Sequence, residues 1–379
     1  MNKGEKRALE AQEDRASESG QKRIKLADAA RCCVKCEESK PLDQYNVMIA
    51  NKDGLQPYCK QCSRLASKMY NKTHSGFINS LISRSIINTT ERNKKGRNHE
   101  TSMLTKEKLN KLIKKQDGKC AISGAVLVFK PFSNNQASVD RINNDLGYVD
   151  GNYRIVCLEF NSATKWSREL LVKAVSLSGI PPENFETEIS DLEIAPRRGG
   201  RHTTVQRKWV RESKNGITVI FCHYCSETKP DGDFYKQLSL GCKTCNIKRV
   251  QEIHSTWRGA IQALLCDARK HTEARNNTRL KMGATEQKCT LTYGQLVVIL
   301  KKQGGMCAYS QVALSPKMGV WKMSLERIDI TKGYDDTNAC LVCQPFNGSD
   351  HSGRADGTVD GSGGWTREKF LQYAALVSA

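Results

Sequence analysis

The sequence has no apolar run long enough to span a membrane and no apolar leader at its start. None of its apolar stretches reaches 18 residues, whereas a membrane-spanning helix needs about 20. The first ten residues, MNKGEKRALE, are charged where a secretory signal would be apolar. We therefore expect an intracellular protein that is neither secreted nor membrane-spanning, and no membrane among its partners. A nuclear location is compatible with a eukaryotic host.

The sequence contains few acidic and few apolar residues. There are 40 Asp and Glu against 60 Lys and Arg, which gives a formal net charge of +20. This excess favours a polyanionic partner, because each phosphate neutralised by a cationic side chain releases counterions. Nucleic acid fits best, and acidic proteins or an anionic membrane are the alternative. The hydrophobic share of 38% is low and indicates that part of the chain is tail or linker.

Cysteine is abundant by contrast, and eight of the 16 cysteines form four CxxC pairs. Without a secretory segment, this pattern favours metal over disulfides. Two thiolates three residues apart can face one ion from a tight turn, and two such pairs complete the tetrahedral shell of a structural zinc. Buried or redox-active thiols are the alternative. The two expected zinc sites are Cys33, Cys36, Cys59 and Cys62, and Cys222, Cys225, Cys242 and Cys245.

The chain repeats itself. The first cysteine pairs of the two sets lie 189 residues apart, and each is followed by Lys-Pro and an aromatic residue. Downstream, KKQDGKCAIS matches KKQGGMCAYS, and VDRINNDLGYVDGNYRIVCLEFN matches LERIDITKGYDDTNACLVCQPFN at an offset of 186. WSRELLVKAV then matches WTREKFLQYA as an amphipathic closing helix. Chance does not keep register over such a length, so we expect a tandem duplication.

The expected fold class is α+β, in two tandem copies that each place a four-cysteine knuckle before a larger module. The charged, core-poor start predicts a disordered tail that contains a string similar to a nuclear-import signal. The insertion SGRADGTVDGSGG in the second copy predicts a mobile loop. The expected segments are the tail 1–28, the first knuckle 29–70, the first larger module 71–185, the linker 186–215, the second knuckle 216–250 and the second larger module 251–379.

One string in the first larger module can build a cation site. A strand ends at the β-branched Val139, NNDLG predicts a turn, YRIVCL predicts a second strand, and a helix follows from Asn161. An Asp and an Asn about twenty residues apart can converge on one hard cation if a hairpin and a helix bring them together. Oxygen ligands suit Mg²⁺ or Mn²⁺, which would polarise a scissile phosphate. Basic residues nearby would hold the nucleic-acid backbone.

This string resembles the ββα-metal motif of HNH (His-Me finger) endonucleases, particularly the phage-type group with CxxC knuckles related to recombination endonuclease VII. The resemblance covers residues 104–177 and, less well, 291–375, and the knuckles add 29–70 and 216–250. It implies that both larger modules are HNH-like nuclease domains. It also implies Asp140 and Asn161 as metal ligands, Asn152 as a brace of the loop between strand and helix, and Lys165 as a phosphate-contacting or structural lysine.

One position departs from the HNH pattern. Arg141 stands where most HNH enzymes have the histidine that serves as general base. Arginine stays charged and accepts protons poorly, but it can clamp a phosphate with two hydrogen bonds. If the first copy is active, Tyr148 or a metal-bound water is the expected base.

The second copy departs further, because Glu326 replaces the aspartate and His351 replaces the lysine. The extra methylene moves the carboxylate by roughly an ångström, and such sites tolerate little misplacement. His351 is interpreted as a solvated loop residue. The alternative is that it serves as a base or as a metal ligand. The first copy is therefore the better candidate for catalysis, and the second is weakened or retained for DNA binding. Its equivalent site residues are Glu326, Arg327 and Asn347.

Several other residues are interpreted as structural. Trp166 and Trp365 are expected to pack between helix and sheet. Cys120 and Cys157, which recur as Cys307 and Cys343, are expected to be packed core cysteines rather than a further zinc site. His271 lies in basic, polar surroundings and is expected on the solvated surface.

Together these patterns favour a metal-dependent endonuclease that hydrolyses phosphodiester bonds in double-stranded or branched DNA, as a monomer with an internal pseudo-dimer. Zn²⁺ would be structural and Mg²⁺ or Mn²⁺ catalytic. The alternative is a non-catalytic, zinc-containing DNA-binding protein derived from a nuclease, favoured by the missing histidine. A zinc-dependent protein-interaction scaffold explains the knuckles but not the repeated Arg…Asn…Asn string.

Overall fold

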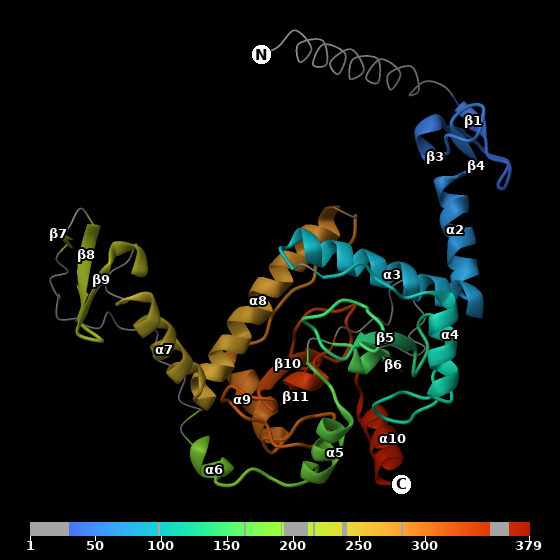
Figure 1. The fold of residues 1–379 in the computed structure, drawn as a ribbon. Helices are drawn as coiled ribbons and strands as arrows, with labels where there is room; N and C mark the ends of the chain where they lie inside the picture. Colours follow the sequence, from blue (N-terminus) through green and yellow to red (C-terminus); the bar gives the residue numbers. More distant parts are fainter. Residues whose placement is uncertain are drawn as a thin grey trace. The chain divides into compact units, whose positions relative to one another are not determined.

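The computed structural model describes residues 30–97, 99–162, 164–190, 192, 211–214, 217–236, 241–281, 283–348 and 364–379. These residues form a mixed α+β structure with small sheets of two or three strands (Figure 1). None of their helices is both long and apolar enough to cross a bilayer. The predicted tail 1–28, His351 and all but the last residue of the predicted mobile loop lie outside the described residues.

Contacts along the chain define two compact bodies. The N-terminal body is Met1–Asn98 with Leu104–Lys106 and Phe129–Pro131. The C-terminal body is His99–Met103, Glu107–Val128 and Phe132–Ala379. The first knuckle therefore belongs to one body, whereas both hairpins of the predicted nuclease modules and the second knuckle belong to the other.

The N-terminal body consists of the first knuckle and two helices. Strand β1 pairs with β2 and β3 with β4, both antiparallel. Helix α2 starts directly after β4, where Cys59 caps it by accepting a hydrogen bond from the Cys62 N–H. Helix α3 starts after Thr73, whose hydroxyl accepts from the Gly76 N–H. The bounds are β1 Ala30–Cys32, β2 Ser39–Pro41, η1 Leu42–Gln44, β3 Tyr45–Val47, β4 Leu55–Cys59, α2 Lys60–Asn71 and α3 His74–Lys94.

The second knuckle and its helices repeat this order inside the C-terminal body. Strands β7, β8 and β9 form an antiparallel sheet, and helix α7 is capped by Cys242 as α2 is by Cys59. Gly259 lies against the backbone carbonyl of Ile253 so closely that a side chain would not fit, and Gly76 does the same at Tyr70. The bounds are β7 Arg211–Lys214, β8 Ile217–Cys222, β9 Glu227–Pro230, η3 Asp231–Asp233, α7 Lys243–His254 and α8 Trp257–Lys281.

The C-terminal body also contains two β-hairpins, each followed by a 3₁₀ turn and a helix. We call β5, β6, η2 and α5 hairpin module 1, and β10, β11, η5 and α10 hairpin module 2. Both ladders are antiparallel and five residue pairs long. The bounds are α4 Lys106–Lys115, β5 Ala137–Arg141, β6 Tyr153–Cys157, η2 Leu158–Phe160, α5 Arg168–Leu177, α9 Tyr293–Lys302, β10 Met323–Arg327, β11 Ala339–Cys343, η5 Gln344–Phe346 and α10 Arg367–Ser378.

A glutamine ties each hairpin to the helix before it. After α4, the Gln116 amide donates to the Ile155 carbonyl at 2.8 Å and accepts from the Ile155 N–H at 2.9 Å. After α9, Gln303 makes the same two bonds to Leu341, at 2.8 and 2.9 Å. These paired bonds satisfy a backbone donor and acceptor that the hairpin leaves open. They give the glutamine of both KKQ strings the same role.

The two hairpin modules share one aromatic core. Phe160 lies edge-on to Trp365 at 5.2 Å between ring centroids, and Trp166 lies near Phe346 at 5.3 Å. The two tryptophan rings are 5.2 Å apart. The tryptophans are buried as expected, but each packs against the opposite module as well as its own turn.

A buried ion pair accompanies this core. Lys369 in α10 donates through Nζ to Glu159 in η2, and side-chain exposure is 9% for the lysine and 0% for the glutamate. The same lysine donates to the Gly364 carbonyl at 3.0 Å. Burial raises the pKa of Glu159, whereas the charge of Lys369 lowers it.

Both ends of the predicted linker 186–215 contain secondary structure. Phe185 begins the short helix α6 (Phe185–Glu188), and its ring packs 5.6 Å from that of Trp257. The Trp257 indole N–H donates to Glu188 at 2.7 Å. At the other end, β7 pairs with β8 before the predicted start of the knuckle. The acidic composition of this segment favoured a linker, although the segment also contains apolar residues that pack in the interior. These buried residues are Phe185, Ile189 and Leu192.

Candidate functional site

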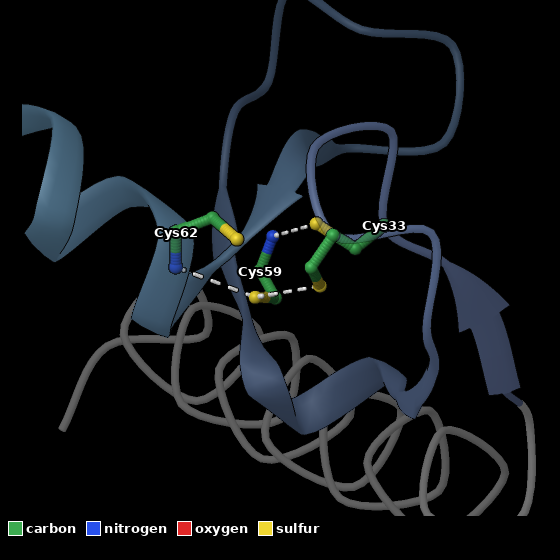
Figure 2. Close-up of side chains that lie close together, drawn as sticks. Cys33, Cys59 and Cys62 are labelled. Atoms are coloured by element: carbon green, nitrogen blue, oxygen red, sulfur yellow. Dashed lines mark hydrogen bonds between the residues drawn. The ribbon is translucent and has the colours of Figure 1, made fainter.

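The structure brings each predicted set of four cysteines together. The sulfur atoms within each set lie within 4.8 Å of one another. Figure 2 shows three of the first set, Cys33, Cys59 and Cys62, with their sulfurs facing a shared space. Backbone N–H groups point at these sulfurs, from Cys59 to Cys33 at 3.2 Å and from Cys62 to Cys59 at 3.4 Å. The second set makes the same bonds at 3.3 and 3.5 Å, among Cys222, Cys242 and Cys245.

Those N–H groups favour thiolates. Burial raises the pKa of Cys33, but the backbone N–H groups around its sulfur outweigh burial and lower the pKa to about 6. Cys222 follows the same pattern, also to about 6. Burial and the neighbouring thiols raise the pKa of Cys62 and of Cys245 to about 12. Each group can therefore hold a metal ion, and a closed set of four sulfur donors suits zinc.

The remaining paired cysteines are core residues, as expected. Cys120 and Cys157 are 3% and 0% exposed, and the Cys157 N–H donates to the Cys120 sulfur at 3.2 Å. Cys307 and Cys343 repeat the contact at 3.3 Å. Within the described residues no third group of metal-ligating side chains accompanies them.

The predicted cation ligands of module 1 lie at one corner of the hairpin. Asn161 donates through Nδ2 to the Ser138 hydroxyl at 2.8 Å and to the Val139 carbonyl at 3.0 Å. These bonds hold the amide beside the strand position that precedes Asp140. They use the amide hydrogens, so Oδ1 is the atom of Asn161 that can accept a cation.

Asp140 has a partner that the sequence analysis missed. Arg154, opposite it in the ladder, donates through Nε at 3.0 Å and lies at 2.9 Å through Nη2, both to Oδ2. Burial raises the pKa of Asp140, and the charge of Arg154 opposes that rise. The hairpin register was the available signal, because a turn centred between the strands sets residue 154 across from residue 140.

The other predicted residues of module 1 are arranged around the turn. Arg141 is buried and donates to the Asn144 and Leu146 carbonyls, both at 2.8 Å. Asn152 bonds the Asn143 backbone and the Gly147 carbonyl, so it braces the loop between the strands rather than the one before the helix. Tyr148 is buried beneath the Arg141 guanidinium, 5.8 Å from its ring centroid. Lys165 is exposed.

Module 2 repeats the corner. Asn347 donates to the Ser324 hydroxyl at 2.7 Å and to the Leu325 carbonyl at 2.9 Å, beside Glu326. Asn338 braces the turn through the Asp329 and Gly333 carbonyls. Opposite Glu326 in the ladder stands Cys340, where module 1 has an arginine.

Glu326 and Asn347 line a common cavity of about 810 Å³. One wall is helix α8 and the other is strand β10 with the turn after it. Arg327 lies on the second wall and donates through Nη1 to the Ile330 and Lys332 carbonyls, at 2.8 and 3.0 Å. We call this cavity the α8 groove. The sequence analysis did not find it, because it depends on packing between a helix and a strand more than forty residues apart.

Comparison of the whole chain with protein-family models, with curated proteins and with solved structures found no match.

Proposed function

We propose that the chain is a metal-dependent endonuclease that hydrolyses phosphodiester bonds in DNA, with its two hairpin modules acting as halves of an internal pseudo-dimer. The observation that carries this proposal is the acid–amide corner, which occurs once in each module. In both corners an asparagine commits its amide hydrogens to the strand beside the acidic residue. Its amide oxygen can therefore join the neighbouring carboxylate at one cation.

The donor sets suit a hard cation. Asp140 with Asn161, and Glu326 with Asn347, would hold Mg²⁺ or Mn²⁺, because both ions prefer carboxylate and amide oxygens. A bound ion of this kind polarises the scissile phosphate and stabilises the leaving oxygen. The chain's own residues fix the corner: Asn152 and Arg141 hold the turn that follows the acidic strand. Lys165, exposed after the asparagine, would contact the backbone phosphates.

The knuckles and the charge support a nucleic-acid substrate. Structural Zn²⁺ in both four-cysteine groups would order two small folds that have few other core residues. The net charge of +20 favours a polyanion. Duplex or branched DNA fits a molecule with two related centres.

A second candidate is a non-catalytic DNA-binding protein. It is favoured by the ion pair at Asp140, because Arg154 already neutralises the carboxylate that a cation would take. The arginine that stands in place of the usual base in each module also supports it.

Cleavage of supercoiled plasmid in Mg²⁺ or Mn²⁺ tests the proposal. We expect linear product from the wild type and mainly nicked product when one corner is disabled, either by Asp140→Asn with Asn161→Ala or by Glu326→Gln with Asn347→Ala. Fluorescence anisotropy with duplex DNA and no added Mg²⁺ or Mn²⁺ serves as the control, because binding should persist in both variants. DNA binding without cleavage in either metal would favour the second candidate. Cleavage that survives both pairs of substitutions would remove the acid–amide corner from the mechanism.

A further inference from the structure

Helix α8 presents a polar face to the α8 groove. Its groove-lining residues recur every three or four positions, the spacing of one helical face. Asp267 and His271 are one turn apart on this face, and both are exposed. The sequence analysis treated His271 as an ordinary surface residue. The structure places it in the same cavity as Glu326 and Asn347.

The groove also concentrates fixed positive charge. Arg275 and Arg327 stack on the Tyr334 ring, 5.4 and 5.5 Å from its centroid. Two guanidinium groups held on one ring repel each other, and an anion bound between the walls would offset that repulsion. Arg279 adds a third guanidinium to the same cavity.

The carboxylate of this groove stands in different surroundings from that of module 1. The strand position opposite Glu326 is Cys340. Asp140 instead faces Arg154. The groove therefore combines an acidic residue, an amide, a histidine and three arginines in one cavity.

We propose that the α8 groove holds the phosphodiester to be cut and that His271 is the proton acceptor for the attacking water. This inference rests on the proposed endonuclease function and deepens it. The water oxygen forms a bond to phosphorus while the phosphorus–oxygen bond to the leaving strand breaks. The proton of the water moves to the His271 imidazole, and the electron pair of the broken bond stays on the leaving oxygen, which takes a proton from solvent. The imidazolium then returns its proton to solvent.

The internal repeat supplies a comparison for this role. Gly76 and Thr89 of α3 correspond to Gly259 and Thr272 of α8, since each glycine meets the preceding helix and each threonine donates four residues back. In that register Asn88 takes the place of His271. Helix α3 thus has a non-ionisable residue at the position equivalent to His271. Substitution of His271 should therefore leave the fold intact.

The first test measures whether the groove binds DNA. It does not depend on cleavage. Protein labelled with ¹³C at histidine Cε1 gives a resonance for each of its seven histidines. His271→Asn assigns one of them, and His254→Asn assigns a control on α7, outside the groove. Adding a duplex oligonucleotide without Mg²⁺ or Mn²⁺ should shift or broaden the His271 resonance more than that of His254. Equal or absent changes at His271 would overturn the proposal.

The second test asks whether His271 takes the proton. Nicking is measured in a chain whose first corner is disabled by Asp140→Asn with Asn161→Ala, so that only the groove can cut. In that chain His271→Ala should reduce the nicking rate by about 100-fold or more, and added imidazole should restore part of it, because a free base can enter the vacated space. In the same chain His254→Ala should leave the nicking rate unchanged. An unchanged rate with His271→Ala, or a loss that imidazole does not restore, would remove the proton-acceptor role. If the wild type cleaves in no metal, the proposed function and the proton transfer both fail, and the resonance shift alone decides whether the groove binds DNA.

Discussion

Replacing Lys369 by methionine should destabilise the protein strongly, because it leaves a carboxylate buried between the two hairpin modules. Glu159 is fully buried, and its Oε1 accepts its hydrogen bond from Lys369. Among the described residues its Oε2 has no hydrogen-bond partner. Methionine keeps the length of the side chain, so the packing of α10 changes little while the positive charge is removed.

The magnitude follows from the cost of a buried, unpaired carboxylate. Breaking a buried ion pair by removing one partner costs about 3–5 kcal/mol. The variant can limit this cost by protonating Glu159, and protonating a glutamate with an ordinary pKa of about 4.3 at pH 7 costs about 3.7 kcal/mol. We therefore expect the free energy of unfolding to fall by about 3–4 kcal/mol at pH 7.

The loss should depend on pH, with a definite sign. In the variant, the folded state holds Glu159 with a raised pKa, so the folded state binds a proton more tightly than the unfolded state. Stability is then greatest below the unfolded pKa and decreases as the pH rises toward the folded pKa. Between pH 5 and pH 7 the free energy of unfolding of the variant should fall by up to about 2.7 kcal/mol, and by more than that of the wild type, whose Lys369 lowers the pKa of Glu159.

Urea unfolding followed by tryptophan fluorescence measures this effect, because Trp166 and Trp365 lie in the shared core. Lys173→Met, an exposed lysine on α5, is the matched control and should change stability by less than about 0.5 kcal/mol. Adding Glu159→Leu to Lys369→Met should recover most of the loss. A loss below about 1 kcal/mol at pH 7, or an equal loss at both pH values, would refute the reasoning.

Three other outcomes are expected. Cys33→Ser should reduce bound zinc from two ions to one per chain by elemental analysis, and it should melt the first knuckle while the second keeps its helices; two ions in the variant would contradict the site. Asn152→Ala should lower the free energy of unfolding by about 1–3 kcal/mol, because the amide satisfies buried backbone groups of the turn; equal stability in urea unfolding would show that the brace is dispensable. The logarithm of the DNA association constant should fall steeply and linearly with the logarithm of salt concentration, and a flat plot would argue against contacts to the phosphate backbone.

Much of the candidate site could be predicted because it depends on local spacing. The CxxC pairs specified both four-cysteine groups, since two thiolates three residues apart face one point whatever surrounds them. The order of hairpin and closing helix followed from turn residues and apolar periodicity, and the repeated string located both asparagines. These features need only a few neighbouring residues to form.

The remaining features depend on contacts between distant segments. Arg154 becomes the partner of Asp140 only through the strand register, and Lys369 meets Glu159 across 210 residues of sequence. The α8 groove depends on the packing of a long helix against a strand, which periodicity does not specify. The acidic segment around α6 was predicted to be a linker because acidic residues dominate its composition. Its packing is instead determined by its three buried apolar residues.

The asymmetry of the shared core makes the two copies non-interchangeable. Alignment of the repeats puts Pro345 at the position of Glu159 and Leu170 at that of Lys369. A molecule assembled from two first copies would bury two carboxylates with no ammonium group, and one assembled from two second copies would bury two ammonium groups with no carboxylate. The two modules are therefore complementary rather than identical at this contact. A substitution in one module therefore has to fit only the other module, and not a second copy of itself.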